Sequence, residues 1–219
     1  MCNTTNKPIT KTNKEHSAIR IFLMYLWRSI AAGVMIALAG YVYLNCENKY
    51  VGALLFSIGL ITICYYSLNL YTSIVGYICN QSNLTKFLGR LLVAIIGNAI
   101  GCFIVAGMPI SDVAINSLQI INNKTDVFSA FTNSFLCGMM IFIAVDIYKT
   151  KHSIIGILFC IPCFILSGME HSVANMYYFF LAPSIKHLLF IGIYIIGNGI
   201  GSIFANVVLT AHTRLVNKR

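Results

Sequence analysis

The sequence predicts an all-α membrane protein built from six transmembrane helices. Three observations carry this prediction: the composition, the spacing of the apolar stretches and the placement of the cations. Of the 219 residues, 58% are hydrophobic and only 10% are charged, whereas a soluble domain usually carries about 25% charged residues. So few charges cannot cover a water-facing surface of this size. The composition therefore excludes an ordinary soluble enzyme and favours a chain that crosses the bilayer several times.

Six apolar stretches follow a polar and basic N-terminal segment. They run over residues 29–46, 51–79, 91–108, 127–148, 153–181 and 188–210. Most of them reach or exceed the length of about 20 residues that one crossing needs. The connections are short and polar. We therefore expect a cytoplasmic N-terminal tail over residues 1–27, a six-span domain over residues 28–211 and a cytoplasmic C-terminal tail over residues 212–219.

The 15 Lys and Arg residues divide unequally between the two sides of this arrangement. With six spans both termini share one side, and that side receives Lys7, Lys11, Lys14, Arg20, Arg28, Lys86, Arg90, Lys149, Lys151, Arg214, Lys218 and Arg219. The other side receives Lys49, Lys124 and Lys186. Cytoplasmic loops carry the excess of Lys and Arg, so the termini are expected in the cytoplasm of a chain in the inner (plasma) membrane. The net charge of +9 then marks orientation, and no nucleic-acid partner is expected.

Two similar segments lie 100 residues apart, in the third and sixth predicted spans. Gly97 and Asn98 begin a Gly-Asn-Ala-Ile-Gly segment, and Gly197 and Asn198 begin a Gly-Asn-Gly-Ile-Gly segment. The Gly-x-x-x-Gly spacing by itself indicates close helix packing. An Asn repeated at the same place in two halves of three spans each predicts an inverted 3+3 repeat, because an odd number of spans reverses the second half.

The second and fifth spans are each near 29 residues and hold a polar cluster, at residues 65–73 and 167–175. The two clusters occupy matching positions in the two halves. Irregular backbone at membrane depth survives only where protein buries it or water reaches it. We therefore expect both helices to break at the membrane midplane and to meet at a pore or binding site.

Glu170 and His171 are adjacent ionisable residues in the fifth span. Such groups are costly inside the membrane and are usually functional. We expect Glu170 to be mainly structural and His171 to be functional. The eight Cys residues are expected to act as small apolar side chains, and neither a metal nor another cofactor is expected.

These segments resemble the formate/nitrite transporter family. Residues 168–176 read Gly-Met-Glu-His-Ser-Val-Ala-Asn-Met, similar to the family signature Gly-Phe-Glu-His-Ser-x-Ala-Asn-Met. Residues 70–73 resemble its Leu-Phe-Thr loop, and the two Gly-Asn pairs match its third and sixth spans. The resemblance implies an aquaporin-like protomer, a homopentamer with one pore per subunit, and transport rather than enzyme activity. The implied substrates are small monovalent anions of weak acids: formate, nitrite, hydrosulfide and, in some members, acetate or lactate.

The resemblance also implies roles for individual residues. His171 matches the central pore histidine, Thr72 the loop residue facing it, and Asn175 and Glu170 the groups bracing the loop. The apolar constrictions match Phe56, Leu60, Leu70 and Phe164, with Tyr71 in place of the usual loop Phe. Lys124 matches a family lysine only across a two-residue gap. The fourth span departs from the family pattern, with Gly138 in place of an Asn and Asp146 in place of a Trp.

One mechanism follows as a hypothesis. A bare anion loses its hydration in an apolar slit, whereas a weak acid avoids that loss by taking a proton and crossing neutral. His171 either hands over the proton or only hydrogen-bonds the passing species while water supplies it. The alternative function is a neutral-solute channel for water or glycerol-like molecules. That class predicts paired Asn-Pro-Ala loops and a filter arginine, yet the sequence has no Asn-Pro-Ala and no Arg between Arg90 and Arg214.

Overall fold

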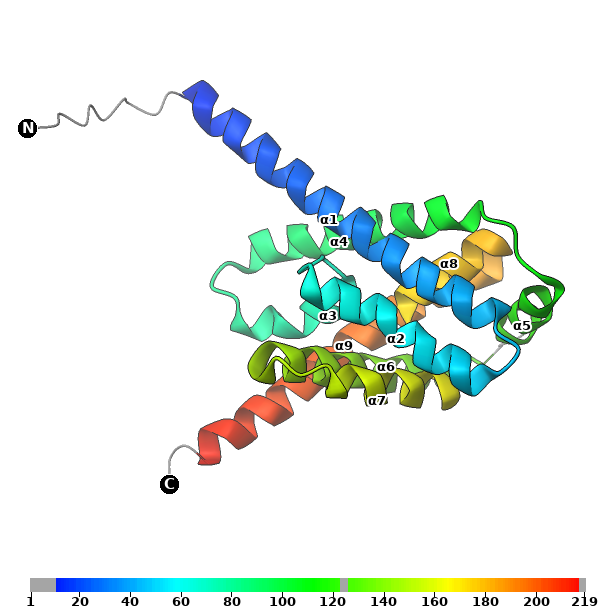
Figure 1. Cartoon of the computed structure of the whole chain (residues 1–219). Helices are drawn as coiled ribbons and strands as arrows, with labels where there is room; N and C mark the ends of the chain where they lie inside the picture. The colour runs from blue at the N-terminus through cyan, green and yellow to red at the C-terminus, as the bar shows by residue number, and fades with distance from the viewer. Residues whose placement is uncertain (1–10, 123–125, 217–219) are drawn as a thin grey trace, which may run out of the picture.

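A computed structural model describes residues 11–122 and 126–216 of the chain, and every regular element in these residues is helical (Figure 1). The elements are α1 (Lys11–Asn45), α2 (Lys49–Tyr65), α3 (Tyr71–Ile74), the 3-10 helix η1 (Val75–Asn80), α4 (Leu84–Ala106), α5 (Asp112–Asn122), α6 (Val127–Lys151), α7 (Ile155–Leu166), α8 (Ser172–Leu181) and α9 (Ile185–Val216). The all-α prediction is confirmed.

Four of the described helices are long and apolar enough to cross a membrane alone. They are α4, α6 and the segments Ser17–Asn45 of α1 and Ile185–Ala211 of α9. The apolar helices α2 and α7 are shorter. The predicted second span contains α2, α3 and η1, and the predicted fifth span contains α7 and α8. Each of these spans is thus divided at its polar cluster.

Helices α2 and α7 end in the same way. The N–H groups of Leu68 and Met169 donate to carbonyls five residues earlier, at 2.9 and 3.0 Å. The residues before them, Ser67 and Gly168, are left-handed with φ of 50° and 70°. This is the Schellman arrangement, which gives the last carbonyls of a helix their hydrogen-bond partners. It turns the chain sharply, so the next residues can enter the interior as extended backbone.

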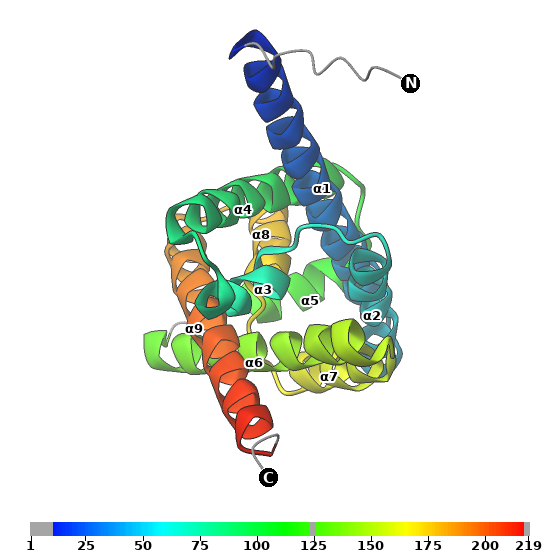
Figure 2. The ribbon, with the colours of Figure 1, turned by 90° about the vertical axis from the view of Figure 1, so that its left-hand side faces the viewer.

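The long helices pack in pairs, α1 on α4 and α6 on α9. A Cβ atom added at Gly97 would collide with Ser29 of α1, and one added at Gly197 would collide with Ser134 of α6. Both glycines therefore serve close helix approach, as the Gly-x-x-x-Gly spacing predicted. Viewed along the molecule, α3 and α8 lie inside a ring formed by α1, α2, α7, α6, α9 and α4 (Figure 2).

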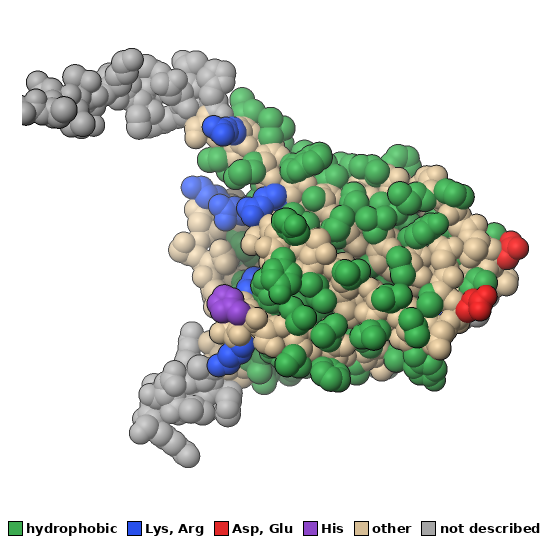
Figure 3. All heavy atoms as spheres, in the orientation of Figure 1, with side chains coloured by type: hydrophobic (Ala, Val, Ile, Leu, Met, Phe, Trp, Pro, Cys, Tyr) green, Lys and Arg blue, Asp and Glu red, His purple; other side chains and the backbone are tan. Residues whose placement is uncertain are grey.

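Charge is segregated between the two ends of the molecule. The described parts of α1 and α9 begin and end, respectively, at the same end (Figure 1). Lys and Arg side chains gather there, which we call the basic end, and acidic side chains lie at the opposite end of the face in view (Figure 3). Between the ends this face is largely hydrophobic (Figure 3).

Candidate functional site

The two interrupted segments meet at Thr72 and His171. Thr72 is the second residue of α3, and His171 is the last residue before α8. The Thr72 Oγ1 atom lies 2.9 Å from the His171 Nε2 atom. Both residues are buried, with exposed fractions of 0% and 2%. The fold therefore joins two polar residues that lie 99 positions apart in the sequence.

The hydrogen bonds of His171 assign its tautomer. The Ala174 N–H donates to His171 Nδ1 at 3.1 Å, so the imidazole caps the N-terminus of α8. Because Nδ1 accepts this bond, the proton of the neutral ring lies on Nε2. Nε2 then donates to the Thr72 hydroxyl oxygen. The site therefore presents a fixed N–H donor and a hydroxyl group side by side.

Glu170 and Asn175 lie directly behind His171. The Asn175 amide donates to Glu170 Oε2 at 2.9 Å and to the His171 carbonyl at 3.0 Å. Both side chains are 3% exposed. The amide thus ties the carboxylate to the backbone of the loop.

Asn198 holds the loop that carries His171. Its Oδ1 atom accepts from the Ser172 N–H at 2.7 Å, and its Nδ2 donates to the carbonyls of Ser134 and Glu170 at 2.7 and 2.8 Å. The side chain is 0% exposed. One amide of α9 therefore ties α6 to the loop before α8, and it gives the Ser172 N–H a partner that α8 itself cannot provide.

Asn98 does the same for the loop before α3. It accepts from the Tyr71 N–H at 2.9 Å and donates to the carbonyls of Ser29 and Asn69 at 2.8 and 3.0 Å. The sequence predicted a packing role for this segment and missed its clamping role. The available signal was the Asn itself, since a buried amide must find hydrogen-bond partners.

A cavity of about 260 Å³ reaches His171 and is lined in part by Tyr43, Phe56, Phe164 and Tyr178. The rings of Phe56 and Phe164 meet edge to face, with centroids 6.3 Å apart. The Phe164 ring lies 6.1 Å from the imidazole. Aromatic side chains thus flank the histidine on this side.

The remaining predicted constriction residues lie elsewhere. Leu60 and Leu70 are buried in the same hydrophobic core as Phe56 and Phe164 but do not line this cavity. Tyr71 belongs to a separate cluster, and its hydroxyl donates to the Ile195 carbonyl of α9 at 2.9 Å. Lys124 lies outside the described residues.

The departures in the fourth span have local explanations. A Cβ atom at Gly138 would collide with the backbone of Asn198, so this position excludes a larger side chain. Asp146 accepts from the Tyr77 hydroxyl at 3.1 Å, and Lys149 Nζ lies 4.0 Å from the centre of the Tyr77 ring. Sequence reasoning did not find this polar cluster. Its only signal was Asp146, an acid in an otherwise apolar stretch.

Comparison with known proteins gives consistent results. A family model described as formate/nitrite transporter matches residues 5–211. The formate channel FocA of Haemophilus influenzae is 27% identical over 201 residues, which cover 78% of this chain and 69% of that protein. The formate channel FocB of Escherichia coli is 26% identical over 200 residues, with the same coverage of 78% and 69%.

Two solved structures share the fold, each with a TM-score of 0.68. One is a pentameric formate channel with formate bound, 19% identical, covering 91% of this chain and 98% of that chain. The other is an FNT family ion channel, 20% identical, covering 93% and 92%. At these identities the likeness shows the fold alone. The family match, which spans most of the chain, and the apolar helices together show that this multi-pass membrane protein belongs to the formate/nitrite transporter family.

Proposed function

We propose that this protein conducts small monovalent anions of weak acids, of the formate, nitrite or hydrosulfide class, through a pore that contains His171. The observation that carries the proposal is the Thr72–His171 pair, with Oγ1 and Nε2 2.9 Å apart. It is buried at the end of a cavity whose walls include Phe56 and Phe164. The two similar proteins named as formate channels support this substrate class.

The aromatic pair supplies the barrier in this proposal. A bare anion that enters an apolar constriction loses hydration worth several kcal/mol. A protonated weak acid carries no net charge and keeps only a hydroxyl and a carbonyl or similar group to satisfy. Phe56 and Phe164 are 2% and 3% exposed, so little water reaches their contact. The constriction therefore favours the anions of weak acids, which can take up a proton transiently and cross as neutral acids, over the anions of strong acids, which cannot.

His171 acts here as a hydrogen-bond donor rather than as a proton carrier. Its Nδ1 atom already accepts from the Ala174 N–H, so a second proton on the ring would set two N–H groups against each other. The anion takes its proton from the aqueous solution at one mouth of the pore and returns it to the solution at the other, so the ring of His171 neither gains nor loses a proton. The Nε2–H group and the Thr72 hydroxyl then take the place of the water that the solute leaves behind.

The proposal also covers the assembly of the protein, its orientation in the membrane and its internal repeat. We infer a homopentamer with one pore per protomer, in line with the pentameric formate channel that shares the fold. The basic end (Figure 3), where the described part of α1 begins and that of α9 ends, faces the cytoplasm of an inner (plasma) membrane. The matched clamps of Asn98 and Asn198 support an inverted 3+3 repeat, because each amide binds three equivalent backbone groups.

Flux measurements with the intact protein test this proposal. The purified chain is reconstituted in proteoliposomes, and formate, nitrite, hydrosulfide and acetate fluxes are compared at about pH 5.5 and about pH 7.5, because the protonated fraction of each weak acid is larger at the lower pH. We expect weak-acid flux that rises as pH falls, and only a small chloride leak. Water or glycerol permeation without anion flux would instead support the neutral-solute alternative and reject the proposal.

A further inference from the structure

A groove between α1 and α4 has a chemistry that the proposed pore does not use. It has a volume of about 680 Å³, in the range of small-molecule sites. Arg28 of α1 and Lys86 and Arg90 of α4 line it together with the apolar side chains of Ile21 and Phe22. We call it the basic groove.

The cations of the basic groove have no anionic partner within the part of the chain that the structure describes. No carboxylate lines the groove, and none of the three forms an ion pair with a described Asp or Glu. Lys86 and Arg90 are exposed and lie one helical turn apart on α4. Three unpaired cations on one groove are electrostatically complementary to an anion.

The apolar part of the groove is also unpartnered. Ile21 and Phe22 are 56% and 51% exposed, although both line a groove that contains three cations. An occupant that satisfies both parts must carry an anionic group and a hydrocarbon chain. A free inorganic anion would leave the apolar wall exposed to water.

The length of α1 indicates where the basic groove lies relative to the bilayer. The apolar segment Ser17–Asn45 has 29 residues, which is ~44 Å of helix at 1.5 Å per residue. The hydrocarbon core is only about 30 Å thick. The first two turns of this segment therefore extend to the level of the lipid headgroups, and they project from the helix ring at the basic end (Figures 1 and 2).

From this placement we propose that the basic groove binds an anionic phospholipid. Its phosphate lies against Arg28, Lys86 and Arg90, and an acyl chain lies along Ile21 and Phe22. Basic pockets between transmembrane helices at the cytoplasmic surface bind anionic headgroups for the same reason. The inference does not depend on which solute passes the pore.

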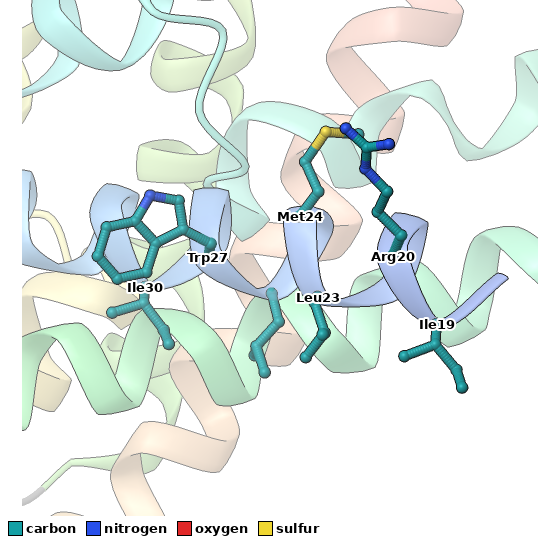
Figure 4. Close-up of a pocket in the computed structure, with 7 residues that line it drawn as sticks. Ile19, Arg20, Leu23, Met24, Trp27 and Ile30 are labelled. Carbon is teal, nitrogen blue, oxygen red and sulfur yellow. The ribbon is translucent and has the colours of Figure 1, made fainter. Parts of the chain in front are cut away.

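A second hollow on α1 provides an internal control. It is lined by Ile19, Leu23, Trp27 and Ile30 among others, and Arg20 is its only cation (Figure 4). Its apolar side chains would contact lipid acyl chains with little dependence on the headgroup. Trp27 is the only tryptophan of the chain and is 70% exposed there.

The test compares tryptophan quenching by brominated lipids at the two places. The native chain reports on the hollow through Trp27, and the double variant Trp27→Phe/Phe22→Trp reports on the basic groove. Each full-length protein is reconstituted in bilayers that contain brominated phosphatidylglycerol or brominated phosphatidylcholine. We expect the reporter at position 22 to prefer phosphatidylglycerol at least about 25-fold, the effect of two cations near an anionic lipid, and Trp27, whose hollow contains only Arg20, to prefer it no more than about fivefold.

Charge variants in the Phe22→Trp background complete the design. Lys86→Gln/Arg90→Gln should lower the preference to about fivefold, the effect of the remaining Arg28. Lys151→Gln/Lys186→Gln removes the same charge from exposed positions outside the groove and should leave the preference intact. Equal quenching by both lipids at position 22, or an equal loss in the two double variants, would overturn the proposal. Protection of position 22 from both lipids would also overturn it, since a second copy of the chain would then cover the groove.

Discussion

The buried amide of Asn198 gives the strongest stability prediction. Substitution Asn198→Ala removes the partner of the Ser172 N–H and of the carbonyls of Ser134 and Glu170. The alanine side chain has no donor or acceptor that could replace these hydrogen bonds, and the Asn198 side chain is 0% exposed. The Ser172 N–H, which starts α8 and has no helical partner, is therefore left unpaired at a place that bulk water does not reach, and the carbonyls of Ser134 and Glu170 each lose one hydrogen bond.

The size of the effect follows mainly from the Ser172 N–H group. An unsatisfied buried polar group costs about 1–3 kcal/mol, so we expect the free energy of unfolding to fall by about 2–3 kcal/mol once the two weakened carbonyls are included. Side-chain hydrogen bonds between regular membrane helices average only about 0.6 kcal/mol. The larger value is expected here because the Ser172 N–H lies at the break before α8, where no helical partner exists.

Equilibrium unfolding in mixed detergent micelles, followed by circular dichroism, measures this change. Asn206→Ala is the matched control on the same helix, because Asn206 is also buried but binds only one backbone group, the Gly76 carbonyl, and its other partners are the side chains of Asn80 and Thr210, which remain able to bind water. Its expected loss is about 1 kcal/mol. A loss below about 1 kcal/mol for Asn198→Ala, or equal losses for the two variants, would refute the clamp as the main support of the His171 loop.

Three further predictions concern the barrier, the helix ends and pH. Phe164→Ala removes the ring between Phe56 and the imidazole. The chloride leak into proteoliposomes should therefore rise at least ~10-fold, which corresponds to a permeation barrier lower by about 1.4 kcal/mol. An unchanged leak would place the barrier elsewhere. Ser67→Gly relieves a left-handed residue with φ of 50° and should stabilise the protein by about 0.5–1 kcal/mol, whereas Gly168→Ala should destabilise it by about 1 kcal/mol; unfolding midpoints that move the other way would contradict the Schellman assignment. The Ser129 hydroxyl and backbone N–H lower the pKa of Asp126, which caps α6. A depressed pKa contributes stability that is present above the unfolded value of about 3.9 and is lost as pH falls through the folded value. Asp126→Asn should remove this acid-side loss, and a pH-stability curve identical to that of the native chain would count against the cap.

The sequence allowed the arrangement of helices to be predicted because apolar length and polar interruption are local signals. Residues 65–73 and 167–175 marked the ends of α2 and α7, and the equivalence of their positions predicted that the two breaks would meet. That Thr72 would face His171 was implied only by the family resemblance. The Gly-Asn repeat indicated close packing, since glycine at a helix crossing has only a steric meaning.

Other features depended on three-dimensional placement that no spacing encodes. The Ala174 N–H bond to His171 Nδ1 needs the helix start and the imidazole rotamer together. The Tyr71 hydroxyl donates to the Ile195 carbonyl, 124 positions away in the sequence. The hydroxyl fits there because residue 199 is glycine, since a Cβ atom at Gly199 would lie only 2.7 Å from it. Such hydrogen bonds between side chains and the backbone can be identified only once the positions of the helices are known.

The role of His171 as a hydrogen-bond donor in the conduction path is the central claim, and the flux of His171→Asn tests it most directly. Asparagine keeps a side-chain oxygen that caps α8 but lacks the Nε2–H group that reaches Thr72. We expect unfolding stability to stay within about 1 kcal/mol of the native value, while formate flux in proteoliposomes falls ~10-fold, about 1.4 kcal/mol of lost stabilisation. Formate flux equal to that of the native protein, at both acid and neutral pH, would contradict the account.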